Sequence, residues 1–252
     1  MMNLSVQEER TEHLASILTG VLLACAGGYL DAFTYVGHGH VFANAMTGNV
    51  VLLGINCVTG SWTAGLRHLP PILAFVVGIS VARGFHLEGV RRWVRLPYLS
   101  ALALEMAILL VMCFLPMATP DVWITTSIAF AASVQVQTFR HVNGKTYNST
   151  YTTGNLRTLS EAAFEWMMGV NRTESARVVR DFSLICVAFL GGAMLGGFVT
   201  PRMGNRALWI EFVPLLIVAA RVWPRRAASA SQAIRPEFGA SQRERASLSD
   251  SD

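Results

Sequence analysis

Long apolar runs separated by short polar connections dominate the chain. Five runs contain close to the roughly 20 mostly apolar residues that a helix needs to cross a bilayer core; they are residues 14–36, 97–116, 121–139, 182–200 and 207–223. A sixth run, 68–85, is shorter and carries Arg83 near its end, where a long side chain can reach the membrane interface. This pattern predicts an all-α, polytopic membrane protein.

Composition strengthens this prediction. Hydrophobic residues make up 52% of the 252 residues and charged residues only 14%, with a mean hydropathy of +0.42, whereas soluble domains carry about a quarter charged residues. The net charge of +4 comes from Lys and Arg in connections and tails, where they act as topology signals. The chain has no basic helix or aromatic platform, so we expect no nucleic-acid partner.

The two halves of the chain share an ordered set of matches, which indicates an internal duplication. At an offset of 106 residues, Thr47-Gly48-Asn49 aligns with Thr153-Gly154-Asn155, and Glu105 aligns with Glu211. Between these matches, "AFVVG" at 74–78 aligns with "AFLGG" at 188–192 at an offset of 114. We therefore predict a first membrane repeat over 14–116 and a second over 117–223.

The segments outside the repeats are polar. Residues 1–13 lack the basic region and cleavage site of a signal peptide, so the first apolar run is expected to remain in the mature protein. Residues 224–252 are rich in Ser, Ala and Arg, a composition typical of disorder. We expect a cytoplasmic N-terminal segment and a disordered cytoplasmic tail.

Basic residues orient the predicted spans. The connection 83–95 carries four Arg and is expected inside, whereas 117–121 carries no Lys or Arg and suits the outside. If the segment 153–170 also crossed, the Arg residues of 172–180 and the tail would lie outside, so we predict that it does not. The count is then three spans per half and six in all, with both termini cytoplasmic. An odd number per half makes the repeats inverted, a topology found in alternating-access transporters.

Asp31 lies inside the first apolar run, where a carboxylate is costly and is expected to face a polar cavity or a partner. Its equivalent at an offset of 106 is Gln137, with Gln135 nearby. The alternative is a hydrated carboxylate near the outer interface, because Asp31 lies only five residues before Val36.

Glu105 lies in the middle of an apolar run, and its equivalent Glu211 lies nearer to the end of another. Two such carboxylates can form a proton or cation relay. Alternatively, each is neutralised by a cation, for which Arg140 and Arg206 are candidates.

The two Thr-Gly-Asn triplets predict a helix break followed by a helix start. Glycine allows positive φ and close backbone approach, and Thr and Asn can cap a helix. The second triplet precedes an apolar stripe with helical spacing, formed by Leu156, Leu159, Ala163, Trp166 and Val170. A helix N-terminus suits an anionic or polar ligand. The alternative is a capped turn that only seats an interfacial helix.

Other motifs for chemistry are weak or missing. His38 and His40 form an isolated pair, too little to predict a zinc site. The four cysteines contain no CxxC pair, and the sequence lacks HExxH, GxSxG and Walker motifs. We therefore expect no metal, no cofactor and no enzymatic activity.

With "GYLDAFTYV" and "TGNVVLLG" in the first half and "TTGNLRTLSEA" in the second, the chain resembles the YoaK-like family, which is grouped as a domain of unknown function. The resemblance covers residues 16–223 and implies a multi-pass protein of the bacterial inner membrane without an established substrate. It also implies a polar core at Gly28, Asp31, Ala32, Thr47, Gly48, Asn49, Gln137, Thr153, Gly154 and Asn155. The family pattern Gly-x-Gln-Asn-Ala is replaced by Val-Gln-Val-Gln-Thr at 134–138.

Two functions fit the sequence. The first is a secondary transporter or permease for a small polar or anionic solute, with Asp31, Glu105 and the two triplets around a cavity between inverted repeats. The second is a non-transporting membrane scaffold or sensor that binds a partner or lipid through its cytoplasmic basic loops. The sequence does not indicate an oligomeric state.

Overall fold

The computed structural model describes residues 16–85, 96–116, 118–142, 145–147, 149 and 152–223. The predicted N-terminal segment, the tail and most of the basic connection 83–95 lie outside these residues.

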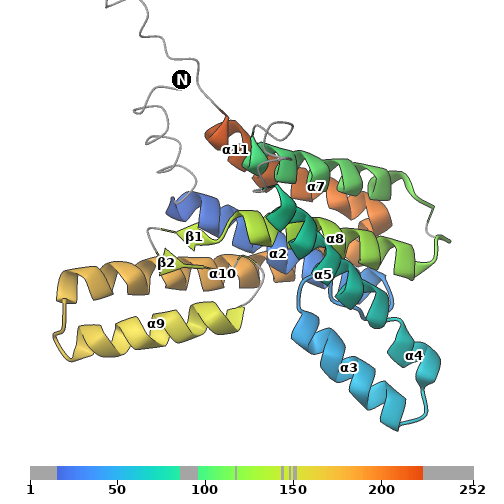
Figure 1. Cartoon of the computed structure of the whole chain (residues 1–252), viewed down its shortest axis with the longest axis horizontal. Coiled ribbons are helices and arrows are strands. Elements are labelled where there is room, and N and C mark those ends of the chain that lie inside the picture. Colours follow the sequence, from blue (N-terminus) through green and yellow to red (C-terminus); the bar gives the residue numbers. More distant parts are fainter. Residues whose placement is uncertain are drawn as a thin grey trace, which may run out of the picture.

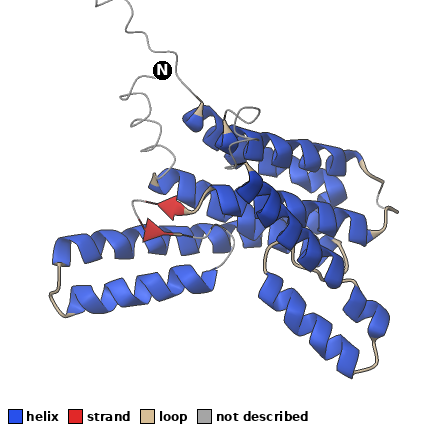
Figure 2. Ribbon diagram, viewed as in Figure 1, coloured by secondary structure: helices blue, strands red, loops and turns tan. Residues whose placement is uncertain are grey.

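Each predicted apolar run forms a helix, within a few residues of its expected bounds at most ends (Figures 1 and 2). These helices are α2 (Ile17–Gly37), α5 (Leu69–Gly84), α7 (Pro97–Phe114), α8 (Asp121–Thr138), α10 (Arg172–Met203) and the pair η1 (Gly204–Glu211) and α11 (Phe212–Val222). The elements between them are α3 (Met46–Val58), α4 (Trp62–Leu66), β1 (His141–Val142), β2 (Lys145–Thr146) and α9 (Thr152–Met167). The two short strands pair in antiparallel fashion.

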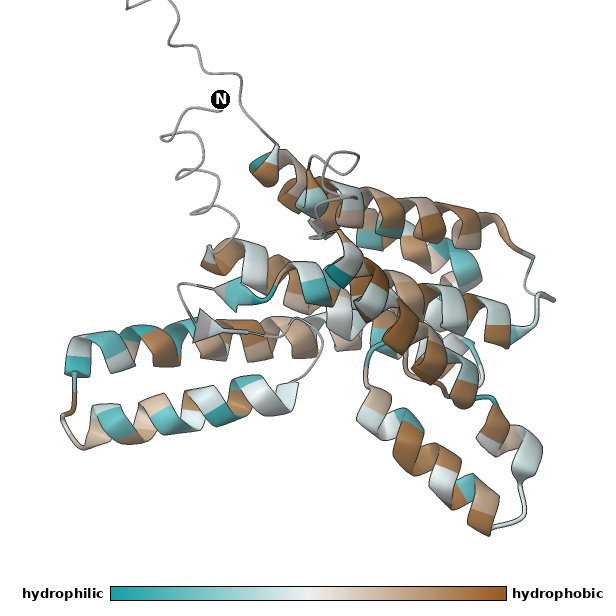
Figure 3. Ribbon diagram, viewed as in Figure 1, coloured by the Kyte–Doolittle hydropathy of each residue, from teal (hydrophilic) through white to brown (hydrophobic). Residues whose placement is uncertain are grey.

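Four helical segments of the described chain are long and apolar enough to cross a membrane: Ile17–Gly37, Trp62–Gly84, Pro97–Phe114 and the continuous stretch Arg172–Val222. Figure 3 shows the apolar character of α5, α7 and the second part of α10. Large apolar side chains on their outer surfaces are more than half exposed, for example Val76 on α5 and Val187 and Phe198 on α10. Such exposure suits contact with lipid rather than with water, so the chain is a helical, multi-pass membrane protein.

Two closely packed helix pairs organise the core: α2 lies against α10, and α5 lies against α8. Glycine makes the first contact possible, because a Cβ on Gly28 or Gly192 would collide with a backbone carbonyl of the partner helix. In the second pair, a Cβ on Gly78 would lie 2.7 Å from the carbonyl oxygen of Phe130. Small residues that let helix backbones approach closely are typical of association within membranes.

Two aromatic hydroxyls tie distant segments to α2. Tyr29 donates a hydrogen bond to the carbonyl of Ala207 in η1. Tyr147, which follows β2, donates to the carbonyl of Gly20 at 2.8 Å. Burial raises the pKa of Tyr147, so its hydroxyl remains a neutral donor.

Helices α3 and α9 leave the centre of the molecule in different directions, with their N-terminal ends nearest to it (Figure 1). After α9 has run outward, the first part of α10 returns alongside it. This explains why α10 begins ten residues before the predicted run 182–200: its polar first part packs on α9 and carries no apolar signal (Figure 3).

Candidate functional site

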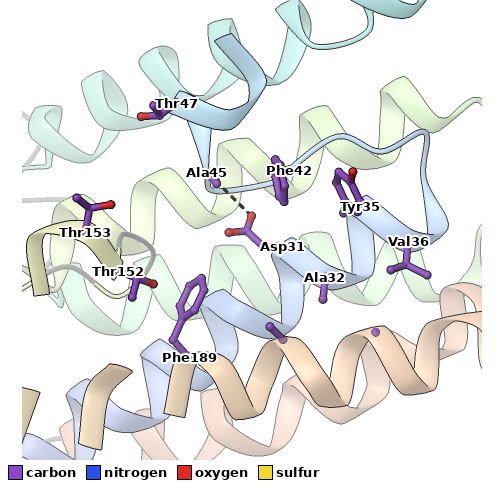
Figure 4. Close-up of a pocket in the computed structure, with 12 residues that line it drawn as sticks. Asp31, Ala32, Tyr35, Val36, Phe42, Ala45, Thr47, Thr152, Thr153 and Phe189 are labelled. Carbon is purple, nitrogen blue, oxygen red and sulfur yellow. Dashed lines mark hydrogen bonds between the residues drawn. The ribbon is translucent and has the colours of Figure 1, made fainter. Parts of the chain in front are cut away.

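A cavity of about 690 Å³ lies where α2, α10 and the starting turns of α3 and α9 meet (Figure 4). Its polar lining residues are Asp31, Tyr35, Thr47, Thr152 and Thr153. The remaining lining is apolar and includes Phe42 and Phe189. The volume lies within the range of ligand pockets in proteins, roughly 300–1,000 Å³. This cavity is therefore the candidate site.

The two Thr-Gly-Asn triplets meet at this cavity through their threonines. Thr47 is the second residue of α3, and Thr153 is the second residue of α9. Both side chains line the cavity, although they are 106 positions apart in the chain. Each triplet thus lies in the first turn of a helix, and the two helices start at the same site.

Asp31 is held between the loop before α3 and the cavity. Its Oδ1 accepts hydrogen bonds from the backbone N–H of Asn44 at 2.7 Å and of Ala45 at 3.3 Å. The side chain is only 5% exposed. Figure 4 shows the second carboxylate oxygen directed into the cavity, on the side of Thr152.

The loop that positions Asp31 is itself fixed to α2. Asn44 donates from Nδ2 to the carbonyl of Gly27 at 3.1 Å. Thr34 accepts from the backbone N–H of Ala43 at 3.0 Å and donates to the carbonyl of Leu30 at 3.0 Å. These bonds hold the chain beside Asp31 in one conformation. The sequence analysis did not identify Asn44, because its role depends on a contact 17 residues away.

Asn49 does not line the cavity. It is fully buried and holds the loop backbone at Phe42, which donates to Asn49 Oδ1 at 2.9 Å and accepts from its Nδ2 at 2.7 Å. His68 Nδ1 also lies 3.2 Å from Asn49 Oδ1. Asn49 is therefore a positioning residue for the loop, and His68 supports it.

The predicted conformation of the first triplet is wrong in two details. Gly48 does not have positive φ, because the break in the chain lies in the loop before α3 and the triplet is already helical. Thr47 and Asn49 do not cap the helix, since the N-cap position is Ala45, which makes no side-chain cap hydrogen bond. Instead, Asp31 accepts hydrogen bonds from the backbone N–H groups of Asn44 and Ala45, just before α3.

In the second triplet, Asn155 is buried in the first turn of α9, and Gly154 is exposed, with no atom of the described residues within 4 Å of where a Cβ would lie. Neither residue lines the cavity. Gly48 differs, because a Cβ there would lie 2.9 Å from the ring of Phe42. A side chain would therefore crowd Phe42 at Gly48 but would meet open space among the described residues at Gly154.

A second polar cluster lies between α7 and η1, away from the cavity lining. Glu105 is completely buried, and its Oε2 accepts a hydrogen bond from Gln135 Nε2 at 2.8 Å. Glu211 is 1% exposed and lies on η1, which contacts α7. Oε1 of each glutamate has no hydrogen-bond partner within the described part of the chain.

The expected partners of these carboxylates need correction. Arg140 and Arg206 are exposed, and the ion pairs found among the described residues do not include either of them. Gln135, rather than a cation, contacts Glu105. Gln137 is half-buried near the end of α8 and does not line the cavity.

Comparison with known proteins agrees with a membrane protein of this length. The family model described as "Protein of unknown function (DUF1275)" matches residues 19–221. The chain is 24% identical over 198 residues to "UPF0700 transmembrane protein YoaK" of Bacillus subtilis (strain 168), a match that covers 76% of this chain and 87% of that protein. No solved structure matches the chain. The resemblance to YoaK-like proteins is confirmed, and the chain belongs to the DUF1275 family.

Proposed function

We propose that this protein is a secondary transporter or permease for a small polar solute, not an enzyme, and that it acts in the bacterial inner membrane. The observation that carries the proposal is the cavity shared by two helix starts, one from each half of the chain, beside the buried carboxylate of Asp31. Helix N-termini that face a common central site are a feature of transporters built from inverted repeats.

The helix contacts support two related halves. In the proposed repeats, α2 corresponds to α8, α3 to α9, and α5 to α10. Helix α7 corresponds to η1 together with α11. The contact of α2 with α10 then becomes that of α8 with α5, and the contact of α7 with α8 becomes that of α11 with α2. Similarly, the contact of α3 with α5 becomes that of α9 with α10. All of these contacts are present.

Six spans require α8 to cross in addition to the more apolar helices and the stretch 172–222 to cross twice. Helix α8 has 18 residues, which rise about 27 Å and so approach the thickness of a bilayer core. Its polar side chains are tolerable in a membrane because Thr125, Ser133 and Gln135 are buried against neighbouring helices. Six spans place both termini on the same side of the membrane, and the four Arg of the connection 83–95 favour the cytoplasmic side.

Glu105 and Glu211 supply a coupling element. Burial without a cation partner disfavours ionisation of both carboxyl groups, and in this proposal the pair binds a proton. The two residues belong to opposite halves and lie on α7 and η1, which are in contact. Loss of that proton would place repulsion between the halves, and this can link a proton to their relative movement.

The test is uptake into proteoliposomes of a panel of radiolabelled small anionic, zwitterionic and neutral polar solutes, with and without an imposed pH gradient. We expect saturable uptake of at least one solute class, lost in Asp31→Asn and reduced in Thr47→Ala. Thr59→Ala is the matched control, because Thr59 lies just beyond the other end of α3 and is exposed. Glu105→Gln should abolish the effect of the gradient.

An absence of flux for every class would contradict the proposal and favour the membrane scaffold. So would equal flux in Asp31→Asn and the unmodified protein, since the carboxylate would then have no role.

A further inference from the structure

We propose that the cavity binds a small zwitterion of the amino-acid type with an apolar side chain, its ammonium group at Asp31 and its carboxylate at the start of α3 and α9. This inference rests on the site described for the proposed transporter and narrows its substrate class. It follows from the charges, the free hydrogen-bond donors and the apolar wall of the same cavity.

The ammonium position follows from Asp31. Among the described residues, no Lys, Arg or His lines the cavity, and Asp31 is the one lining residue of this part of the chain that can carry charge near neutral pH. Its Oδ1 is occupied by the loop amides, and its other oxygen faces the open space (Figure 4). A buried carboxylate requires a cation or a proton to offset its desolvation. A solute ammonium group meets this need in the bound state.

The carboxylate position follows from the helix starts. The first N–H groups of a helix lack intrahelical acceptors and point toward its N-terminal end. Within the described residues, the backbone N–H groups of Thr47 and Gly48 at the start of α3 have no acceptor. The dipoles of α3, with 13 residues, and α9, with 16, both favour negative charge at this end. The hydroxyls of Thr47, Thr152 and Thr153 are further possible donors.

The rest of the cavity excludes most other solutes of this size. Its wall is formed largely by apolar groups, including Val36, Phe42, Phe189 and Ala193. An inorganic anion would leave this wall unused and would face the like charge of Asp31. An apolar amine would leave the N–H groups of the helix starts without the carboxylate acceptor that a zwitterion offers. A zwitterion with an apolar side chain matches all three features.

The test compares full-length protein in detergent micelles with three matched sets of probes. The sets are leucine, phenylalanine and alanine, each with the amine that lacks its carboxylate and the acid that lacks its ammonium group. Binding is measured by ligand-dependent thermal stabilisation and by isothermal titration. We expect at least one amino acid to bind, and its matched amine and acid to bind roughly tenfold or more weakly, since each lacks one charged interaction.

Asp31→Asn should weaken amino-acid binding by a similar factor. Asparagine keeps an oxygen for the loop amides of Asn44 and Ala45, so a comparable melting temperature without ligand shows that the fold is kept. The control is Asp121→Asn, because that carboxylate lies at the start of α8 beside His38 and does not line the cavity. It should bind like the unmodified protein.

Equal binding of the amine would overturn the proposal in favour of a cation site, and equal binding of the acid would overturn it in favour of an anion site. A lack of binding by all three amino acids would also overturn it. Binding of an amino acid without flux in proteoliposomes supports this inference and contradicts the transporter. Saturable flux of a solute that is not a zwitterion, with no amino-acid binding, supports the transporter and contradicts this inference.

Discussion

Gly196→Ala tests the packing of α10 on α2, which forms one wall of the cavity. A Cβ at this position would lie 2.6 Å from the carbonyl oxygen of Tyr29 and 3.2 Å from the Cβ of Ala32, whereas ordinary van der Waals contact begins at 3.4 Å. The tightest neighbour is backbone, so it cannot rotate aside, and the two helices would have to separate by about 0.8 Å at this point. Overpacking of this kind costs about 1–3 kcal/mol.

Gly191→Ala is the matched control on the same helix, because no atom lies within 4 Å of where its Cβ would be. Alanine has a higher helix propensity than glycine by about 1 kcal/mol, so the control should be unchanged or slightly more stable. The assay is unfolding of the detergent-solubilised protein by heat or by SDS, followed by tryptophan fluorescence. We expect Gly196→Ala to be less stable than Gly191→Ala by about 1–3 kcal/mol. Equal stability of the two variants would refute the close crossing of α2 and α10.

Three further substitutions test individual buried hydrogen bonds, each by the same unfolding assay. Asn49→Ala removes two hydrogen bonds from the loop backbone and leaves buried groups unsatisfied, so we expect a loss of about 2–4 kcal/mol; a loss below 0.5 kcal/mol would mean that the loop is held by other contacts. Glu105→Leu deprives Gln135 of its acceptor and should be less stable than Glu105→Gln, which keeps one, by about 1–3 kcal/mol; the opposite order would contradict the observed pair. Tyr29→Phe loses the hydrogen bond to Ala207 while it keeps the ring, so we expect a loss of about 1 kcal/mol, and no change would show that this bond has no net value.

The positions of the apolar helices could be predicted because bilayer thickness fixes the length of each run. The start of α10 could not, because residues 172–181 are polar and pair with α9. The apolar signal marks only the part of a helix that lies in a dry environment. A polar extension is stabilised as a helix by packing on another element, here α9. The local residue pattern does not show that contact.

The candidate site was predicted in part. The repeat located the threonines of both triplets, and membrane depth singled out Asp31, and all three line the cavity. The roles of Asn49 and Asn44 depend on loop backbone that folds onto them, and no residue spacing encodes this. Spacing therefore located the helix starts but not the loop that supports them.

Gln135 and Gln137 show a limit of sequence alignment. The repeat offset selects Gln137, but residues two apart on a helix point in nearly opposite directions, about 200° apart. Gln135 therefore contacts Glu105, on the side of α8 away from Gln137. Neither glutamine lines the cavity. An offset taken from the Thr-Gly-Asn and Glu matches does not determine which face of α8 points toward the protein interior.

The proposed transport function requires that the two helix starts share one water-accessible site, open in turn to each side of the membrane. The direct measurement is labelling of Thr47→Cys and Thr153→Cys, each in a background without the four native cysteines, by a membrane-impermeant thiol reagent in right-side-out and inside-out vesicles. Ala101→Cys is the buried control, since Ala101 is fully enclosed and does not line the cavity. We predict that both threonine positions react from both sides and that the control does not. Failure of both threonine positions to react from either side would show a solid interior and contradict a transport site.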